Sequence, residues 1–143
     1  MEEANERRIA ITLGDPSGVG AEVIVKAMAR LPARERGRYL VIGDGDSLQR
    51  AISACGLDLS IGETDGAIRL HEVPVEGLPR RFGVLSDACG EASFRYVETA
   101  ARLAQGGEVA VIVTAPISKE ALNAAGHNFD GHTGMLAHLT GCR

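Results

Sequence analysis

Aromatic side chains are scarce in this chain of 143 residues, which has two Tyr, three Phe and no Trp, only 3% aromatics in all. An apolar core must therefore be built mainly from Ala, Val, Ile and Leu. The 18 glycines are expected at turns, at helix ends and where two backbone segments approach closely. This composition favours an α/β protein over an aromatic-rich β-sandwich.

Long apolar runs and concentrated positive charge are also absent. No apolar run approaches the roughly 20 residues that a membrane-spanning helix needs. The net charge is −4, and the densest basic group, residues 30–38, is interrupted by Pro32 and Glu35, so nucleic-acid binding has little electrostatic support. The first eight residues are polar and of mixed charge, unlike a signal peptide. We expect neither a membrane nor a nucleic-acid partner.

Cysteine usage indicates a reducing compartment. The chain has three cysteines, an odd number, and their spacing matches no metal-binding pattern. Cys55 and Cys89 fall at predicted helical positions, where they are most simply buried small apolar side chains. We therefore expect a reduced, cytoplasmic protein.

Short apolar runs alternate with helical patterns along the chain. Buried strands are predicted at 8–13, 39–43 and 109–114, with a weaker one at 67–73; helices are predicted at 23–31, 48–55, 87–105, 117–126 and 133–139. Pro74, Gly77 and Pro79 indicate an irregular connection before the third helix. Continuously apolar strands separated by helices predict an α/β fold, with a parallel sheet covered by helices on both faces.

Two segments follow predicted strands, at the sheet edge where open α/β proteins bind ligands. Residues 14–20 (Gly-Asp-Pro-Ser-Gly-Val-Gly) fit an anion-binding turn and a purely structural turn equally well, and match neither the dinucleotide fingerprint nor the P-loop. Residues 114–120 bring Thr114, Ser118 and Lys119 to a helix start, where an ordinary helix N-terminus with a solvated Lys is the simpler interpretation.

A third polar segment, residues 126–134, contains two His, an Asn, an Asp and a Thr between glycines. Hydrogen bonding to a substrate is one interpretation and a solvated loop is another. A zinc site at His127 and His132 is a weaker alternative, because two His five residues apart match no standard ligand pattern. We expect His71 and His138 to be surface or packing residues.

Together and in this order, residues 11–22, 113–119 and 123–133 resemble the amino-terminal part of the 4-hydroxythreonine-4-phosphate dehydrogenase family, which includes relatives acting on threonate and erythronate 4-phosphates. The third stretch is the most specific, since it ends in Gly-His-Thr at Gly131, His132 and Thr133. The resemblance extends along nearly the whole chain. Two positions depart from it: Gly134 stands where the family often has Glu, and Ala21 where it commonly has Pro.

The resemblance implies an α/β/α sandwich like that of isocitrate and isopropylmalate dehydrogenases, and a role in pyridoxine biosynthesis. It implies an NAD-dependent dehydrogenase acting on a small phosphorylated hydroxy acid, whose oxidised β-keto product loses CO₂ with help from a divalent metal. His132 and Thr133 fall on substrate-binding positions. Lys119 falls on a cleft position, where we hypothesise a catalytic role in substrate or proton handling. A homodimer is also implied.

The resemblance further predicts an incomplete fold. The family's metal ligands and phosphate-binding residues lie beyond position 143, so we assign no metal ligand and no cofactor-binding residue within this chain. We expect residues 1–115 to form part of a first α/β domain and residues 116–143 to begin a truncated second one. Such a fragment would leave apolar strand edges and helix faces uncovered and would be inactive alone. The alternative is a non-catalytic module that binds a phosphate or nucleotide or another subunit.

Overall fold

A four-stranded parallel sheet forms the centre of the protein. The computed structural model describes residues 8–142; the polar segment 1–7 and Arg143 lie outside the described residues. The strands are β1 (Arg8–Thr12), β2 (Tyr39–Gly43), β3 (Arg69–Glu72) and β4 (Val109–Thr114), and their order across the sheet is β3-β2-β1-β4. Every pairing is parallel. The four predicted strands are therefore confirmed, including the weak third one.

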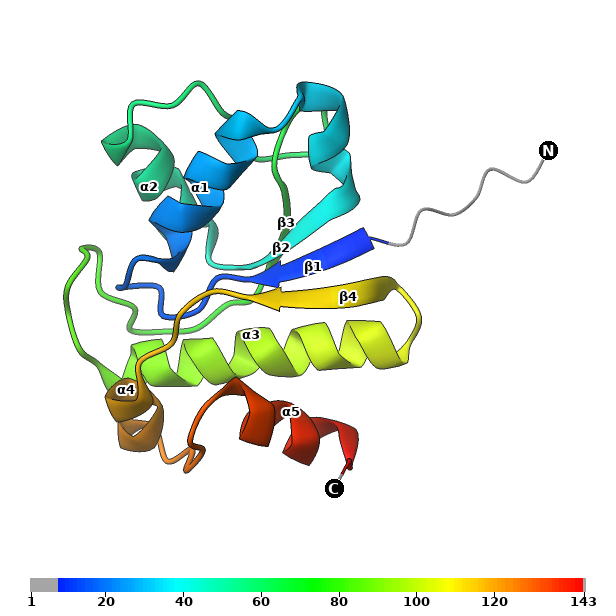
Figure 1. The fold of residues 1–143 in the computed structure, drawn as a ribbon. Helices are drawn as coiled ribbons and strands as arrows, with labels where there is room; N and C mark the ends of the chain where they lie inside the picture. The colour runs from blue at the N-terminus through cyan, green and yellow to red at the C-terminus, as the bar shows by residue number, and fades with distance from the viewer. Residues whose placement is uncertain (1–7, 143) are drawn as a thin grey trace.

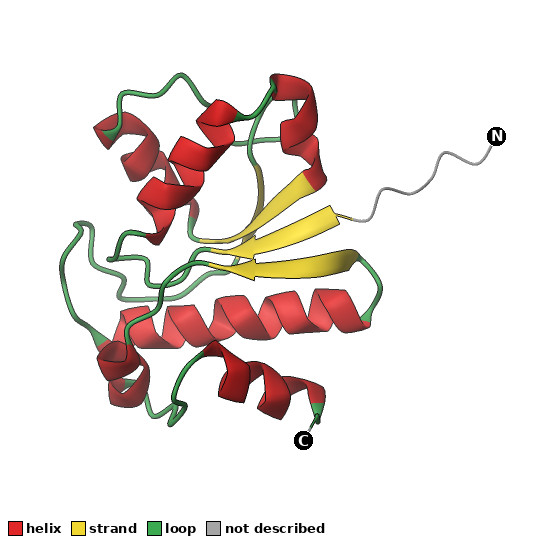
Figure 2. Cartoon of the chain, in the orientation of Figure 1, coloured by secondary structure: helices red, strands yellow, loops and turns green. Residues whose placement is uncertain are grey.

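Helices cover both faces of this sheet (Figure 1). One face carries α1 (Gly20–Arg30) and α2 (Gly45–Ala54), and the other carries the long α3 (Asp87–Gln105). Beyond α3 lie the shorter α4 (Lys119–Ala124) and α5 (His132–Thr140). The separation into helical layers around a central sheet is clear in Figure 2. The predicted α/β/α architecture is confirmed.

Local structure differs from the predictions mainly at helix ends. Ser86, one residue before the predicted helix, caps α3 by accepting a hydrogen bond from the Cys89 amide at 3.1 Å, and Asp87 begins the helix. After Pro32 the chain forms an unpredicted 3₁₀ helix, Ala33–Arg38. This turn places Arg36 so that its guanidinium donates to three backbone carbonyl oxygens, those of Met28, Leu31 and Gly66. The basic group at 30–38 therefore contains a structural residue.

Two apolar clusters stabilise the fold, and α3 contributes to both. The larger fills the space between the sheet and helices α1, α2 and α3, and includes Tyr96, the largest fully buried side chain. The smaller lies where α3 meets α4 and α5, and is built on the buried side chains of Val97, Leu122 and Met135. The smaller cluster joins α3 to residues beyond the predicted domain boundary at residue 115, and the division into two domains stays a prediction.

The contact between α3 and α4 depends on a glycine. An ideal Cβ atom at Gly90 would lie 1.9 Å from the Ala121 carbonyl oxygen and 2.8 Å from the Leu122 nitrogen. No side chain fits that space, so Gly90 allows the two helices to approach backbone to backbone. The position of α4, which begins with Lys119, is set by this contact.

Strand β4 lies at one edge of the sheet and is poorly covered on one face. Val111 and Val113, which alternate along the strand and so share a face, are 49% and 46% exposed. Part of the apolar surface of the sheet is therefore uncovered, and the incompleteness of the sheet stays a prediction. Within residues 8–142, no helix has the length and apolar character needed to cross a bilayer.

We predict that Gly90→Ala destabilises the protein by about 1–3 kcal/mol, because the added methyl group must push α4 away from α3. Gly106→Ala is the matched control, since its nearest neighbour would be 3.4 Å away and its backbone is not left-handed. Urea unfolding followed by circular dichroism measures both variants. Equal stability of the two would contradict the close contact.

Candidate functional site

The carboxyl ends of β1 and β4 bring two of the three polar segments together. The Asp15 amide donates to the Pro116 carbonyl oxygen at 3.0 Å, and the Ala115 amide donates to Thr12 at 3.1 Å. Gly14 has a φ of 75°, and an ideal Cβ there would lie 2.2 Å from the Pro116 oxygen, so only glycine fits. Residues 14–20 and 114–120 therefore form one edge of the sheet, as the parallel topology requires.

Two amide groups of the glycine-rich turn bond to Asp15 within the turn. The Ser17 amide donates to an Asp15 carboxylate oxygen at 2.8 Å, and the Gly18 amide donates to the Asp15 carbonyl oxygen at 2.9 Å. Asp15 is only 9% exposed, so its side-chain oxygens already occupy the inside of the turn. A buried carboxylate repels a phosphate group. Of the two interpretations left open for this turn, the geometry supports the structural one.

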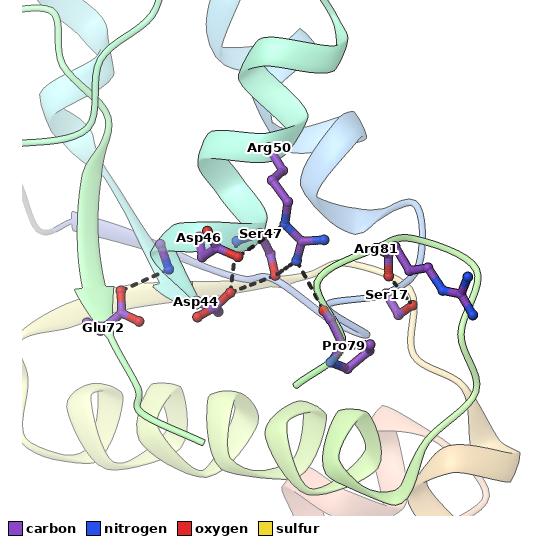
Figure 3. Close-up of polar contacts among 9 residues, drawn as sticks. Ser17, Asp44, Asp46, Ser47, Arg50, Glu72, Pro79 and Arg81 are labelled. Carbon is purple, nitrogen blue, oxygen red and sulfur yellow. Dashed lines mark hydrogen bonds and ion pairs between the residues drawn. The ribbon is translucent and has the colours of Figure 1, made fainter. Parts of the chain in front are cut away.

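Two side chains attach the irregular connection before α3 to the body of the protein (Figure 3). The Ser17 hydroxyl donates to the Arg81 carbonyl oxygen at 3.1 Å and accepts from the Val84 amide at 2.8 Å. Arg50 of α2 donates to the Pro79 carbonyl oxygen at 3.3 Å and lies 5.2 Å from the centre of the Phe82 ring. The connection is therefore held over the glycine-rich turn.

A cavity of about 960 Å³ opens at the carboxyl ends of β2 and β3. Asp44 caps α2, and one Glu72 oxygen accepts from the Gly45 amide at 2.9 Å (Figure 3). Burial raises the pKa of Glu72; the Gly45 hydrogen bond opposes this and the neighbouring Asp44 carboxylate reinforces it. A lining this acidic disfavours a phosphate group. The charged side chains that line the cavity are Asp44, Glu72, Glu76, Asp87, Glu91 and Arg95.

His132 is the first residue of α5. The Nε2 atom is buried and has no hydrogen-bond partner among the described residues. Burial lowers the pKa of His132, and a contact with the backbone of Ala115 partly offsets that effect. The third polar segment thus reaches the end of β4. A neutral imidazole with an unpaired nitrogen can bind a substrate hydroxyl or carboxylate.

Thr133 and Lys119 are both exposed, and no described hydrogen bond or ion pair joins either of them to His132. Thr133 follows His132 in the first turn of α5. Lys119 begins α4 directly after Ser118, whose hydroxyl accepts from the Ala121 amide at 3.2 Å and caps the helix. Their substrate-binding and catalytic roles stay predictions.

His127 makes a different set of contacts from those that a zinc site requires. Its Nε2 atom lies 2.6 Å from a Glu91 oxygen, and its ring stacks on Phe94 with centroids 3.9 Å apart. Within residues 8–142 no three His, Cys, Asp or Glu side chains are grouped to hold a metal ion. Sequence reasoning missed Glu91, because it precedes His127 by 36 residues and belongs to an ordinary helical pattern.

Of the remaining His and Cys residues, Cys89 approaches this edge, where its thiol contacts Asp15 and the backbone of Ser17. His71 lies on β3 and is half-buried, while His138 is exposed and its ring lies 5.4 Å from that of Phe129. Cys89 is fully buried and burial raises the pKa of its thiol, as suits a small core side chain; Cys55 is half-buried and Cys142 is exposed.

Comparison with known proteins gives a consistent result. Residues 35–143 match the family described as pyridoxal phosphate biosynthetic protein PdxA. A D-threonate 4-phosphate dehydrogenase from Cupriavidus necator is 45% identical, over 93% of this chain and 43% of that protein. A 4-hydroxythreonine-4-phosphate dehydrogenase from Trichlorobacter lovleyi is 39% identical, over 94% of this chain and 44% of that protein.

Similarity extends to three dimensions. The crystal structure of a 4-hydroxythreonine-4-phosphate dehydrogenase from Burkholderia phymatum matches this chain with a TM-score of 0.87 at 41% identity. The match covers 96% of this chain and 44% of that one. The chain therefore spans less than half the length of the relatives it matches.

We predict that His132 makes stability depend on pH near neutrality. Because burial lowers its pKa below the ordinary 6.5, protonation favours the unfolded state, and stability is lost as the pH falls from 7.5 to 5.5. Urea unfolding at both pH values measures the loss, and His132→Asn should lose less. Equal losses in the two proteins would show that the ring is not held neutral by the fold.

Proposed function

Because the chain belongs to the PdxA family of pyridoxal phosphate biosynthetic proteins, we propose that it forms the amino-terminal portion of an NAD- and divalent-metal-dependent dehydrogenase. The substrate is a phosphorylated four-carbon hydroxy acid, either 4-hydroxythreonine 4-phosphate or threonate or erythronate 4-phosphate. The reaction is an oxidative decarboxylation, and the chain alone is inactive. The named relatives, both dehydrogenases of 4-phosphates, support the reaction type and the substrate class.

The observation that carries this proposal is the unpaired Nε2 atom of His132 at the carboxyl edge of the sheet. A buried nitrogen without a partner costs stability unless a ligand or water completes it. We assign His132 and the neighbouring Thr133 hydroxyl to binding the polar groups of the substrate. Both side chains come from the first turn of α5, so a movement of that turn shifts both of them relative to the ligand.

Lys119 supplies positive charge at the start of α4. It has no partner among the described ion pairs, unlike Lys26, which pairs with Glu22 at 2.6 Å. An unpaired ammonium group can bind a carboxylate or hold a proton as the substrate hydroxyl is oxidised. We propose that Lys119 is the catalytic group of this chain.

The described residues do not account for the binding of both cofactors. NAD supplies the acceptor for the hydride removed from the substrate. The residues described here do not fit the divalent metal, since no three suitable side chains converge within residues 8–142. We therefore propose that its ligands come from the part of the relatives that this chain does not match, and we assign it no step.

A non-catalytic module that binds a phosphate or nucleotide is the alternative. The glycine-rich turn gives it little support, because Asp15 occupies the place an anion would take. A module that binds another subunit fits the exposed apolar face of β4. We propose a cytoplasmic homodimer on the basis of the family resemblance, with no membrane or nucleic-acid partner.

We predict that His132→Asn weakens binding of D-threonate 4-phosphate or 4-hydroxythreonine 4-phosphate roughly 10- to 100-fold, the range expected when a hydrogen bond to a charged group is lost. Isothermal titration calorimetry with the complete enzyme measures the affinity. His71→Asn is the matched control, since His71 lies on β3 and has no described polar partner. Unchanged affinity of His132→Asn would remove the basis of the proposal.

We predict that Lys119→Ala lowers turnover about 10²- to 10⁴-fold in the complete enzyme, as removal of a group that handles a proton does. NAD reduction in the presence of a divalent metal is the assay. Lys26→Ala, which removes the only other lysine of the chain, should leave turnover unchanged. Unchanged turnover of Lys119→Ala would exclude the catalytic role, and turnover by residues 1–143 alone would refute their inactivity.

A further inference from the structure

We propose that Glu91 is a positioning residue for substrate binding: it holds the loop at 126–131 against α3 and thereby sets the direction of the His132 ring and the Thr133 hydroxyl. This inference rests on the proposed function, which assigns those two side chains to the substrate. No feature of the sequence assigns Glu91 such a role.

The Glu91 carboxylate is held from two sides. One oxygen accepts from Arg95 at 2.7 Å, one turn further along α3, and the other lies 2.6 Å from Nε2 of His127. The hydrogen bond to His127 is the main cause that lowers the pKa of Glu91, and Arg95 adds to it, so the carboxylate stays ionised at neutral pH. Since the Glu91 and His127 side chains are only 32% and 22% exposed, solvent screens their contact less than a surface ion pair.

Ring stacking on Phe94 is a second attachment of the same loop to α3. The His127 ring lies nearly parallel to Phe94, with centroids 3.9 Å apart and planes 10° apart. Phe129 is also parallel to Phe94, at 6.2 Å and 6°. The stacking fixes the plane of the imidazole, and the Glu91 carboxylate fixes its rotation within that plane. The loop at 126–131 is therefore attached to α3 by one polar contact and two ring contacts.

Position of the His132 ring depends on these attachments. Its own Nε2 atom has no partner, so no hydrogen bond of that atom holds the ring in place. The backbone that carries it is fixed before it, at His127 and Phe129, and after it at Met135, which is fully buried. Apart from its contact with the Ala115 backbone, the ring keeps its position through the chain that carries it, and a ligand-binding group held in this way shifts when a nearby attachment is released. Glu91 is the charged member of these attachments.

Coupling between Glu91 and His132 tests the proposal. We expect Glu91→Gln to weaken binding of D-threonate 4-phosphate by about 3- to 10-fold, less than His132→Asn does, because Glu91 acts on the substrate only through the loop. In the Glu91→Gln background, His132→Asn should then cost less affinity than it costs in the unaltered enzyme, because the ring is already displaced. His127→Phe, which keeps the ring stack and removes the hydrogen bond, should reproduce Glu91→Gln.

Glu98→Gln is the matched control, because Glu98 lies exposed on the same helix and makes no described contact. Hydrogen exchange of the loop amides at 126–131 reports release of the loop without substrate, and it should rise in Glu91→Gln but not in Glu98→Gln. Circular dichroism shows that each variant is folded.

Three outcomes would decide the matter against the proposal. If Glu91→Gln and His127→Phe bind substrate as the unaltered enzyme does while His132→Asn does not, Glu91 has no positioning role and the proposed function survives. If the Glu91 and His132 effects multiply independently, Glu91 acts through stability alone. If His132→Asn itself leaves affinity unchanged, the proposed function fails, and the positioning of His132 fails with it.

Discussion

Helix α3 is the element on which the rest of the structure depends, because it buries apolar side chains on two sides. Tyr96 packs into the core beneath the sheet, and the adjacent Val97 packs into the cluster formed with α4 and α5. The helices that carry Lys119 and His132 reach the sheet edge only through this support. A soluble helix usually presents one apolar stripe; α3 presents two, and the second one holds the candidate site in place.

Regular elements were predictable because each has a local cause. The strand at 109–114 is an almost continuous apolar run that follows the helix-ending pair Gly106 and Gly107, and α3 shows apolar residues at helical spacing over five turns. The 3₁₀ helix Ala33–Arg38 was missed because its stabilising bonds run from Arg36 to carbonyl oxygens as distant as that of Gly66. No local pattern encodes a contact over 30 residues.

Site residues, too, were predictable where a local pattern marks them and were missed where a long-range contact decides. The polar segment at 126–134 was recognisable from its composition, and parallel topology was enough to place the ends of β1 and β4 together. The pairing of Glu91 with His127 spans 36 residues and joins two residue types that are common on any surface, so only the tertiary structure shows it. The buried carboxylate of Asp15 likewise resolves what the glycine-rich turn left open.

The free side of β4 has a consequence beyond its exposed valines. An edge strand offers a row of backbone amide and carbonyl groups that point sideways and have no partner on that side. β4 pairs only with β1 in the described sheet, and it is the longest of the four strands. It is therefore a template to which another extended segment can form hydrogen bonds. These bonds involve only backbone groups, so they do not depend on the side chains of that segment. In concentrated solution the same template can join one molecule to the next, so association of the isolated chain would start at this edge.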